Sequence, residues 1–145
     1  MKVRVRLLQG NPGLPGLEGT MAGEEIEVEE WTARTLIRKG LAEFVEPLTI
    51  VELRRMILAE ERERGLRELP QDFFLRLSLA IEQAGELRNQ MKETVEELLE
   101  TRVQKILANL PYRSENLLPE ESVLVNLLST ELERWKEEMR KRLGI

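Results

Sequence analysis

The sequence predicts an α+β protein in which a small N-terminal β-rich (ββαβ) module precedes a mostly α-helical domain built as a helical bundle. The first residues alternate apolar and charged side chains with a period of two, which is typical of strands with one buried face. From residue 49 onward, apolar residues recur at every third or fourth position, which is the period of amphipathic helices. A chain of 145 residues can hold both parts, because a module of about 50 residues fits beside a larger domain.

The elements of the β-rich module follow from changes of this period. Alternation predicts a first strand at about 2–8 and a second at 25–29. Residues 31–39 take up a helical period, and Gly40 follows where a left-handed C-cap would end the helix. Residues 41–45 return to the strand pattern.

The segment between the first two strands carries a glycine at every third position from Gly10 to Gly19. These are formally three collagen-like triplets, too few to sustain a triple helix. The segment also lacks the Gly-Lys-Ser/Thr ending of a phosphate-binding loop. We therefore predict a flexible loop.

The helical domain begins after a short, stiff junction at Glu46-Pro47-Leu48, which divides the chain into domains of residues 1–46 and 47–145. Thr49-Ile50-Val51-Glu52 then has the Thr-x-x-Glu form of a capping box, in which the hydroxyl and the carboxylate each bind a free amide. A helix is expected to start here and to end at Gly65.

A second helical stretch runs from Phe73 to Leu110 and ends before Pro111. Two alternatives stay open, one long helix or two helices that join near Gly85, since glycine costs about 1 kcal/mol relative to alanine inside a helix. Pro119 begins the last helix, with acidic residues suited to its first turn. The apolar stripe of this helix narrows, so its last turns are expected to project into water or toward a partner.

The stretch 69–74 (LPQDFF) is expected to anchor the core and to begin a helix. It holds two of the three Phe residues of the chain, and truncating a buried Phe costs about 3 to 5 kcal/mol. Its proline suits a first helical turn, and its aspartate would place negative charge at the positive helix end. The predicted structural anchors are Leu69, Pro70, Asp72, Phe73 and Phe74.

The composition argues against an enzyme. The chain has no cysteine and no histidine, which excludes disulfides, thiol nucleophiles, thiolate or imidazole zinc sites and histidine-based triads. The many glutamates fall beside lysine or arginine on the charged faces of the predicted helices, so we interpret them as solvated surface. We predict no catalytic residue, no cofactor and no metal ligand.

The net charge of −5 argues against a chain that coats DNA by itself. Arg62, Arg64 and Arg67 could contact phosphate, but glutamates interleave with them, so any DNA contact is expected to be weak or indirect. No apolar run approaches the roughly 18 residues of a membrane span, and no signal peptide pattern opens the chain. A cytoplasmic protein without membrane contact is expected.

The apolar stripes of the helical domain spread over more than one helix face, which is more than a small bundle can cover by itself. Association with other helices is therefore expected. The predicted subunit interface consists of Leu98, Leu99, Val103, Ile106, Leu107, Val123, Leu124, Leu127 and Leu128.

Several segments together resemble an archaeal-type GINS subunit over nearly the whole chain. Residues 3–8, 23–28 and 33–44 (ARTLIRKGLAEF) resemble the small β-rich B domain of that family. The segments that resemble its helical A domain are 69–74, 102–106 (RVQKI) and 116–121 (NLLPEE). The B-like part precedes the A-like part, which is the order of one of the two archaeal subunit classes.

The resemblance implies a non-enzymatic replisome subunit that scaffolds the MCM replicative helicase with a RecJ-family partner during DNA replication. It also implies pairing with a paralogous A-then-B subunit, usually as a two-plus-two heterotetramer, and association with the nucleoid through the replisome. The amphipathic stripes alone would equally suit a helical adaptor or a DNA-binding regulator unrelated to replication, and this alternative stays open.

Overall fold

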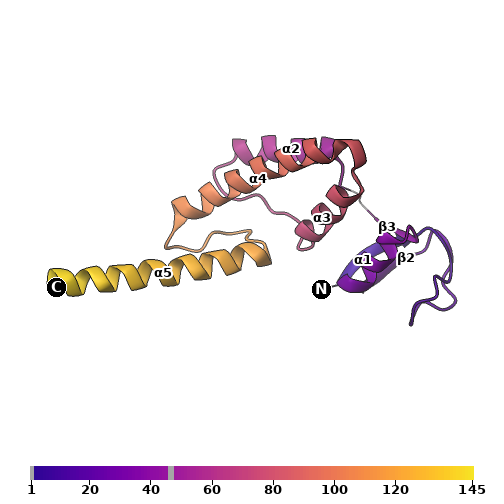
Figure 1. Ribbon diagram of the computed structural model, residues 1–145, viewed down its shortest axis with the longest axis horizontal. Coiled ribbons are helices and arrows are strands. Elements are labelled where there is room, and N and C mark those ends of the chain that lie inside the picture. The colour runs from indigo at the N-terminus through magenta and orange to yellow at the C-terminus, as the bar shows by residue number, and fades with distance from the viewer. Residues whose placement is uncertain (1, 46–47) are drawn as a thin grey trace. The chain divides into compact units, whose positions relative to one another are not determined.

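The computed structural model describes residues 2–45 and 48–145 and has the α+β architecture that the sequence predicts (Figure 1). In chain order the elements are β1 (Lys2–Leu7), β2 (Glu25–Glu29), α1 (Glu30–Arg38), β3 (Ala42–Phe44), α2 (Ile50–Arg62), α3 (Phe73–Gln83), the 3₁₀ turn η1 (Gly85–Leu87), α4 (Arg88–Asn109) and α5 (Pro119–Leu143).

The chain divides into two compact units. The β-rich unit comprises Met1–Thr49 and Asp72–Arg88, and the helical unit comprises Ile50–Gln71 and Asn89–Ile145. The first two residues of the predicted junction, 46–47, lie outside the described residues.

The β-rich unit is built on a three-stranded antiparallel sheet in the order β2-β1-β3. Val5 of the central strand lies opposite Ile26 of β2 and Phe44 of β3, so these apolar residues share one face. On the other face the Arg6 guanidinium donates a hydrogen bond of 3.2 Å to the Glu25 carboxylate. All three predicted strands are confirmed.

The core of this unit lies between the sheet, α1 and α3. Gly40 has a φ of +72°, which confirms the left-handed end predicted for α1. The buried members of the core are Val3, Val5, Leu7, Leu17, Val28, Ala33, Leu36, Ile37, Ala42, Phe44, Leu75 and Leu79.

The glycine-rich segment 10–19 contains no strand or helix, as predicted, but it is tied to the fold. The Asn11 backbone N–H donates to the Thr20 carbonyl oxygen at 3.1 Å, and the Leu17 side chain is buried in the core. The sequence did not predict a core role for Leu17.

α3 packs in the β-rich unit, although its helical period placed it in the helical domain. Leu75 and Leu79 join the core with the sheet, and the Arg76 guanidinium lies 5.5 Å from the centroid of the Phe44 ring. The division of the chain into domains of residues 1–46 and 47–145 stays a prediction. Its test depends on α3, because a cut at residue 46 would separate α3 from the sheet on which it packs.

The helix expected at Pro70 begins later, at Phe73, because residues 71 and 72 form a turn. The Asp72 side chain makes no helix-capping hydrogen bond and instead accepts one from Arg76 Nε at 3.0 Å. Phe73 is the fully buried member of the predicted anchors, and its ring meets that of Phe74 edge-on with centroids 5.6 Å apart. Leu69, Asp72 and Phe74 are half-buried and Pro70 is exposed.

The open choice between one and two helices is settled at Gly85. Gly85 has a φ of +56°, a conformation that residues with a side chain rarely adopt, and η1 separates α3 from α4 at this point. α4 then ends at Asn109, before Pro111.

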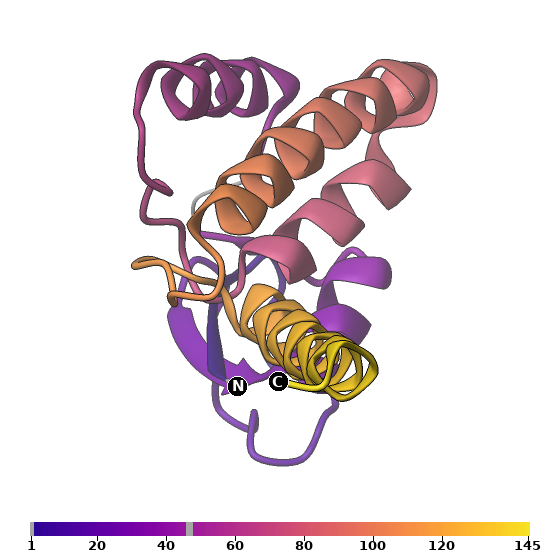
Figure 2. The ribbon, with the colours of Figure 1, turned by 90° about the vertical axis from the view of Figure 1, so that its left-hand side faces the viewer.

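The helical unit contains α2, α5 and all of α4 from Asn89 onward. Leu66, Ile106 and Val125 form a buried cluster that joins the loop after α2 to α4 and α5. α5 continues well past the end of α4 (Figure 1), and Figure 2, which looks nearly along α5, shows that α4 runs obliquely to it. The helical unit therefore holds α5 near its N-terminal end.

Candidate protein interaction site

The helical unit buries the guanidinium of Arg102, which is 1% exposed, together with the equally buried carboxylate of Glu60. Arg102 stands in the buried stripe of α4, four residues after Leu98 and four before Ile106. Its Nε and Nη2 atoms each donate a hydrogen bond of 2.7 Å to the Glu121 carboxylate, and Nη1 donates one of 2.6 Å to Glu60. Such two-point pairing fixes the relative direction of the groups as well as their distance.

The remaining guanidinium hydrogens bind backbone oxygens. Nη1 also donates to the Arg67 carbonyl oxygen at 3.0 Å, and Nη2 donates to that of Asn116 at 3.2 Å. Every N–H group of Arg102 therefore has an acceptor.

The carboxylates of Glu60 and Glu121 also accept hydrogen bonds from donors other than Arg102. Lys105 Nζ lies 2.5 Å from Glu60 Oε2 and also donates to the backbone oxygens of Glu60 and Gly65. The backbone N–H of Arg67 donates to Glu60 Oε2 at 3.1 Å. Glu121 Oε1 accepts the N–H of Leu118, which caps the first turn of α5.

We call this arrangement the Arg102 network (Glu60, Arg102, Lys105 and Glu121), and its hydrogen bonds favour the charged forms of Glu60 and Arg102. Burial acts to raise the pKa of Glu60, but hydrogen bonds from Lys105, Arg102 and the Arg67 backbone outweigh it, so the pKa lies below the usual glutamate value. Burial acts to lower the pKa of Arg102, but the paired Glu121 and Glu60 carboxylates outweigh this effect, so the pKa lies above the usual arginine value. Two formal positive charges and two formal negative charges thus meet in one cluster, and each carboxylate has a cation within 2.7 Å.

The Arg102 network connects four parts of the helical unit: the end of α2, the loop that follows it, α4, and the start of α5 with the loop before it. α5 has few other attachments, because Glu121 and Val125 are its only buried residues. Arg102 therefore fixes the position and direction in which α5 leaves the bundle.

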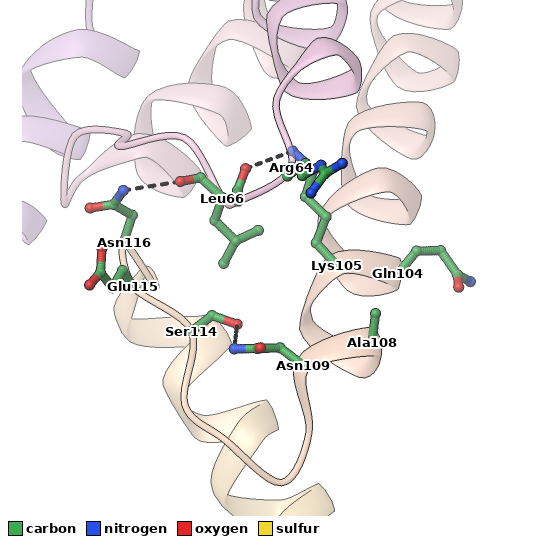
Figure 3. Close-up of a pocket in the computed structure, with 10 residues that line it drawn as sticks. Arg64, Leu66, Gln104, Lys105, Ala108, Asn109, Ser114, Glu115 and Asn116 are labelled. Carbon is green, nitrogen blue, oxygen red and sulfur yellow. Dashed lines mark hydrogen bonds between the residues drawn. The ribbon is translucent and has the colours of Figure 1, made fainter.

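A hollow of about 600 Å³ lies beside the network, between the loop after α2, the end of α4 and the loop before α5 (Figure 3). The polar groups that line it are mostly bound to each other. Asn116 Nδ2 donates to the Leu66 carbonyl oxygen at 3.0 Å, and Asn109 Nδ2 donates to Ser114 Oγ at 3.1 Å (Figure 3). These bonds brace the two loops against α4.

The residues predicted for the subunit interface fall into groups of different exposure. Leu98 and Ile106 are 2% and 1% exposed, so the fold already uses them and leaves little surface for a partner. Leu107, Val123 and Leu127 are 43%, 58% and 62% exposed. Leu99, Val103, Leu124 and Leu128 are half-buried. The interface role of this set stays a prediction.

The apolar side of α5 extends beyond the predicted set. Leu132, Trp135 and Leu143 are 38%, 60% and 71% exposed, at helical spacing that continues the stripe from Leu124 and Leu128. We call Val123, Leu127, Leu132, Trp135 and Leu143 the α5 surface. A large tryptophan exposed on a projecting helix is unusual for a surface that meets only water.

The sequence analysis missed the Arg102 network, because it interpreted the glutamates as solvated surface. Glu60 and Glu121 are corrections to that interpretation, since they are 1% and 8% exposed. One signal was available. Glu60 follows Ile57 and Met56 in an apolar stripe, and Arg102 interrupts the stripe of α4, so each charge stood where an apolar residue was expected.

Among the described residues, neither a metal site nor a membrane helix is found. Within residues 2–45 and 48–145, no three carboxylate, histidine or cysteine side chains gather in a way that could hold a metal ion. The described helices include none that is long and apolar enough to cross a membrane.

A helical bundle with a satisfied buried charge network and large exposed apolar side chains along a projecting helix is typical of the class of proteins that associate with other proteins. Residues 48–140 match the family described as Sld5, GINS complex protein helical bundle domain. The chain belongs to this GINS family, and is thus a replication-related subunit of a type that forms complexes with other GINS subunits and is not catalytic. A search of curated proteins finds no match to the chain.

Proposed function

We infer that the protein is an archaeal-type GINS subunit of the B-then-A class, which acts without catalysis as a scaffold in the replisome. The order of the chain supports this class, because the three-stranded unit begins before the matched bundle of residues 48–140. Its partner is a paralogous subunit of the A-then-B class, and two copies of each make a heterotetramer.

The observation that carries the proposal is the α5 surface. Val123, Leu127 and Trp135 are all about 60% exposed on a helix that the bundle holds near its N-terminal end. At roughly 25 cal/mol for each Å² of apolar area removed from water, burying about 400 Å² would provide about 10 kcal/mol of gross stabilisation. The entropy of association offsets part of this stabilisation. A partner helix of comparable length would bury the most apolar area along α5, so it is the partner that we favour.

The assembled complex would link the MCM helicase to a RecJ-family protein during DNA replication. This role needs surfaces and no chemistry, which agrees with a chain that lacks cysteine and histidine. DNA contact is indirect or weak, because the exposed Arg62 and Arg64 stand beside Glu61 and Glu63. The protein would work in the cytoplasm, at the nucleoid, wherever the replisome assembles.

Affinity purification of the tagged full-length chain from its source, followed by mass spectrometry, tests the proposal. A GINS paralogue and MCM are expected among the proteins that co-purify in near-equal amounts. Leu127→Glu should lose the paralogue, because a carboxylate desolvated at an interface is penalised. Glu133→Lys changes the charge of the same helix at an exposed residue outside the α5 surface, and should retain it.

Recovery of neither a paralogue nor MCM would overturn the proposal. Partners from transcription or signalling in their place would establish a helical adaptor or regulator unrelated to replication.

A further inference from the structure

A second hollow, of about 410 Å³, lies between α2 and α4 of the helical unit and is separate from the α5 surface. Its apolar part comes from α2, where Ile57 is 4% exposed and Leu58 is 54% exposed. Leu58 is a large side chain that this chain leaves uncovered at the edge of a concave site. The hollow can therefore receive an apolar side chain beside Leu58.

The charged lining of this hollow is strongly acidic. Glu61, Glu93 and Glu97 border it and are all exposed. Arg54 is the cation at the site, and its Nη2 atom donates to Gln90 Oε1 at 3.2 Å. No ion pair joins the three carboxylates to a cation anywhere in the described chain, residues 2–45 and 48–145.

Four exposed carboxylates in the second half of α5 are different. Glu131, Glu133, Glu137 and Glu138 each lie within 3.6 Å of an arginine or lysine of the same helix. The three carboxylates at the α2/α4 hollow therefore differ from this stretch of α5 in having, among the described residues, no cation within ion-pair distance.

We propose that the α2/α4 hollow docks a basic amphipathic helix of a partner protein, which places an apolar side chain beside Leu58 and lysine or arginine side chains against Glu61, Glu93 and Glu97. An amphipathic helix that lies in a groove can present an apolar side chain to the groove and charged side chains on either side of it. Nucleic acid does not fit, because its phosphates would face three carboxylates. A single metal ion does not fit either, since no three carboxylates among the described residues gather closely enough to hold one.

The site rests on residues other than those of the α5 surface, so it can be tested apart from subunit assembly. The probe is a fluorescent amphipathic peptide of about five helical turns with leucine on one face and flanking lysines. A second peptide has glutamate in place of each lysine. Anisotropy titrations use the full-length chain at two salt concentrations.

The decisive variant is Glu61→Gln/Glu93→Gln/Glu97→Gln. Exposed ion pairs are individually weak, and three together should raise the Kd of the lysine peptide about tenfold and reduce its salt dependence. The matched control, Glu131→Gln/Glu133→Gln/Glu137→Gln, removes the same charge from α5 and should change the Kd less than about twofold. Leu58→Ser should weaken binding about fivefold without changing the salt dependence.

The glutamate peptide should not bind. Equal weakening by the two triple variants would show binding to net charge alone and overturn the proposal. The absence of measurable binding of the lysine peptide to the unmodified chain, or full binding to Leu58→Ser, would overturn it as well.

Discussion

Replacing Arg102 with methionine removes the guanidinium and leaves a side chain of similar length in its place. Glu60 and Glu121, which are 1% and 8% exposed, then lose their shared partner. Breaking a buried ion pair by removing one member costs about 3 to 5 kcal/mol, because an uncompensated charge stays behind. Glu60 retains Lys105 at 2.5 Å, so Glu121 carries most of this penalty.

A loss of about 4 kcal/mol is a large part of the 5 to 15 kcal/mol that stabilises a typical domain. Urea unfolding of the full-length chain, followed by circular dichroism, should therefore show a much lower midpoint for Arg102→Met. Arg134→Met is the control, because its ion pair with Glu131 is 70% and 63% exposed. That variant should stay within about 0.5 kcal/mol of the original protein.

A second substitution identifies the cause. Glu121→Gln removes the unpaired charge while its amide oxygen can still accept the Leu118 N–H, so in the Arg102→Met background it should restore about 1 to 3 kcal/mol. The same change in the original protein should destabilise, because it leaves Arg102 underpaired. The reasoning is refuted if Arg102→Met costs less than about 1 kcal/mol, or if Glu121→Gln is equally harmful in both backgrounds.

Three further predictions follow from other parts of the molecule. The pKa of Glu60 is lower in the folded protein than in the unfolded chain, so the stability that its carboxylate contributes is complete above the ordinary glutamate pKa and is lost as the pH falls through the folded value. In acid titrations, the free energy of unfolding of Glu60→Gln should therefore fall less steeply with decreasing pH than that of the original protein. An unchanged slope would contradict this. Gly85→Ala should lower the thermal midpoint through strain of at least about 1 kcal/mol, since its φ is +56°, and a stabilised variant would contradict the assigned break. Leu107→Glu, at a residue 43% exposed, should dissociate the subunit complex in sedimentation without changing helix content; intact complexes would remove Leu107 from the interface.

Local periodicity was sufficient to predict most elements of this fold. The alternation in residues 2–8 and the capping pattern at Thr49 placed β1 and α2 close to where they lie, because each signal comes from neighbours along the chain. Gly85 was recognised as the candidate break for the same reason. What periodicity could not decide was whether the break would be used.

The sequence could not predict contacts between distant residues. Arg102 meets Glu60 across 42 positions and Glu121 across 19, so nothing near Arg102 identifies its acceptors. α3 shows the same limit, since its helical period is explicit but its packing with the β-rich unit through Leu75 and Leu79 depends on tertiary structure. The sign in the sequence was a charged residue inside an apolar stripe. Such a residue indicates that a buried partner exists, but it does not identify which residue the partner is.

The location of the Arg102 network explains how a small bundle can present a long helix in a defined direction. Apolar contacts such as Leu66 with Val125 tolerate sliding, whereas hydrogen bonds from one guanidinium to Glu121 and to the Asn116 carbonyl oxygen are directional. A small rotation at Glu121 is magnified along α5, where Trp135 lies about 20 Å further on at 1.5 Å per residue. Buried charge is an expensive way to stabilise a fold but an effective way to orient one of its elements. In the assembly proposed above, the network would act through the direction that it gives the α5 surface, without itself contacting a partner.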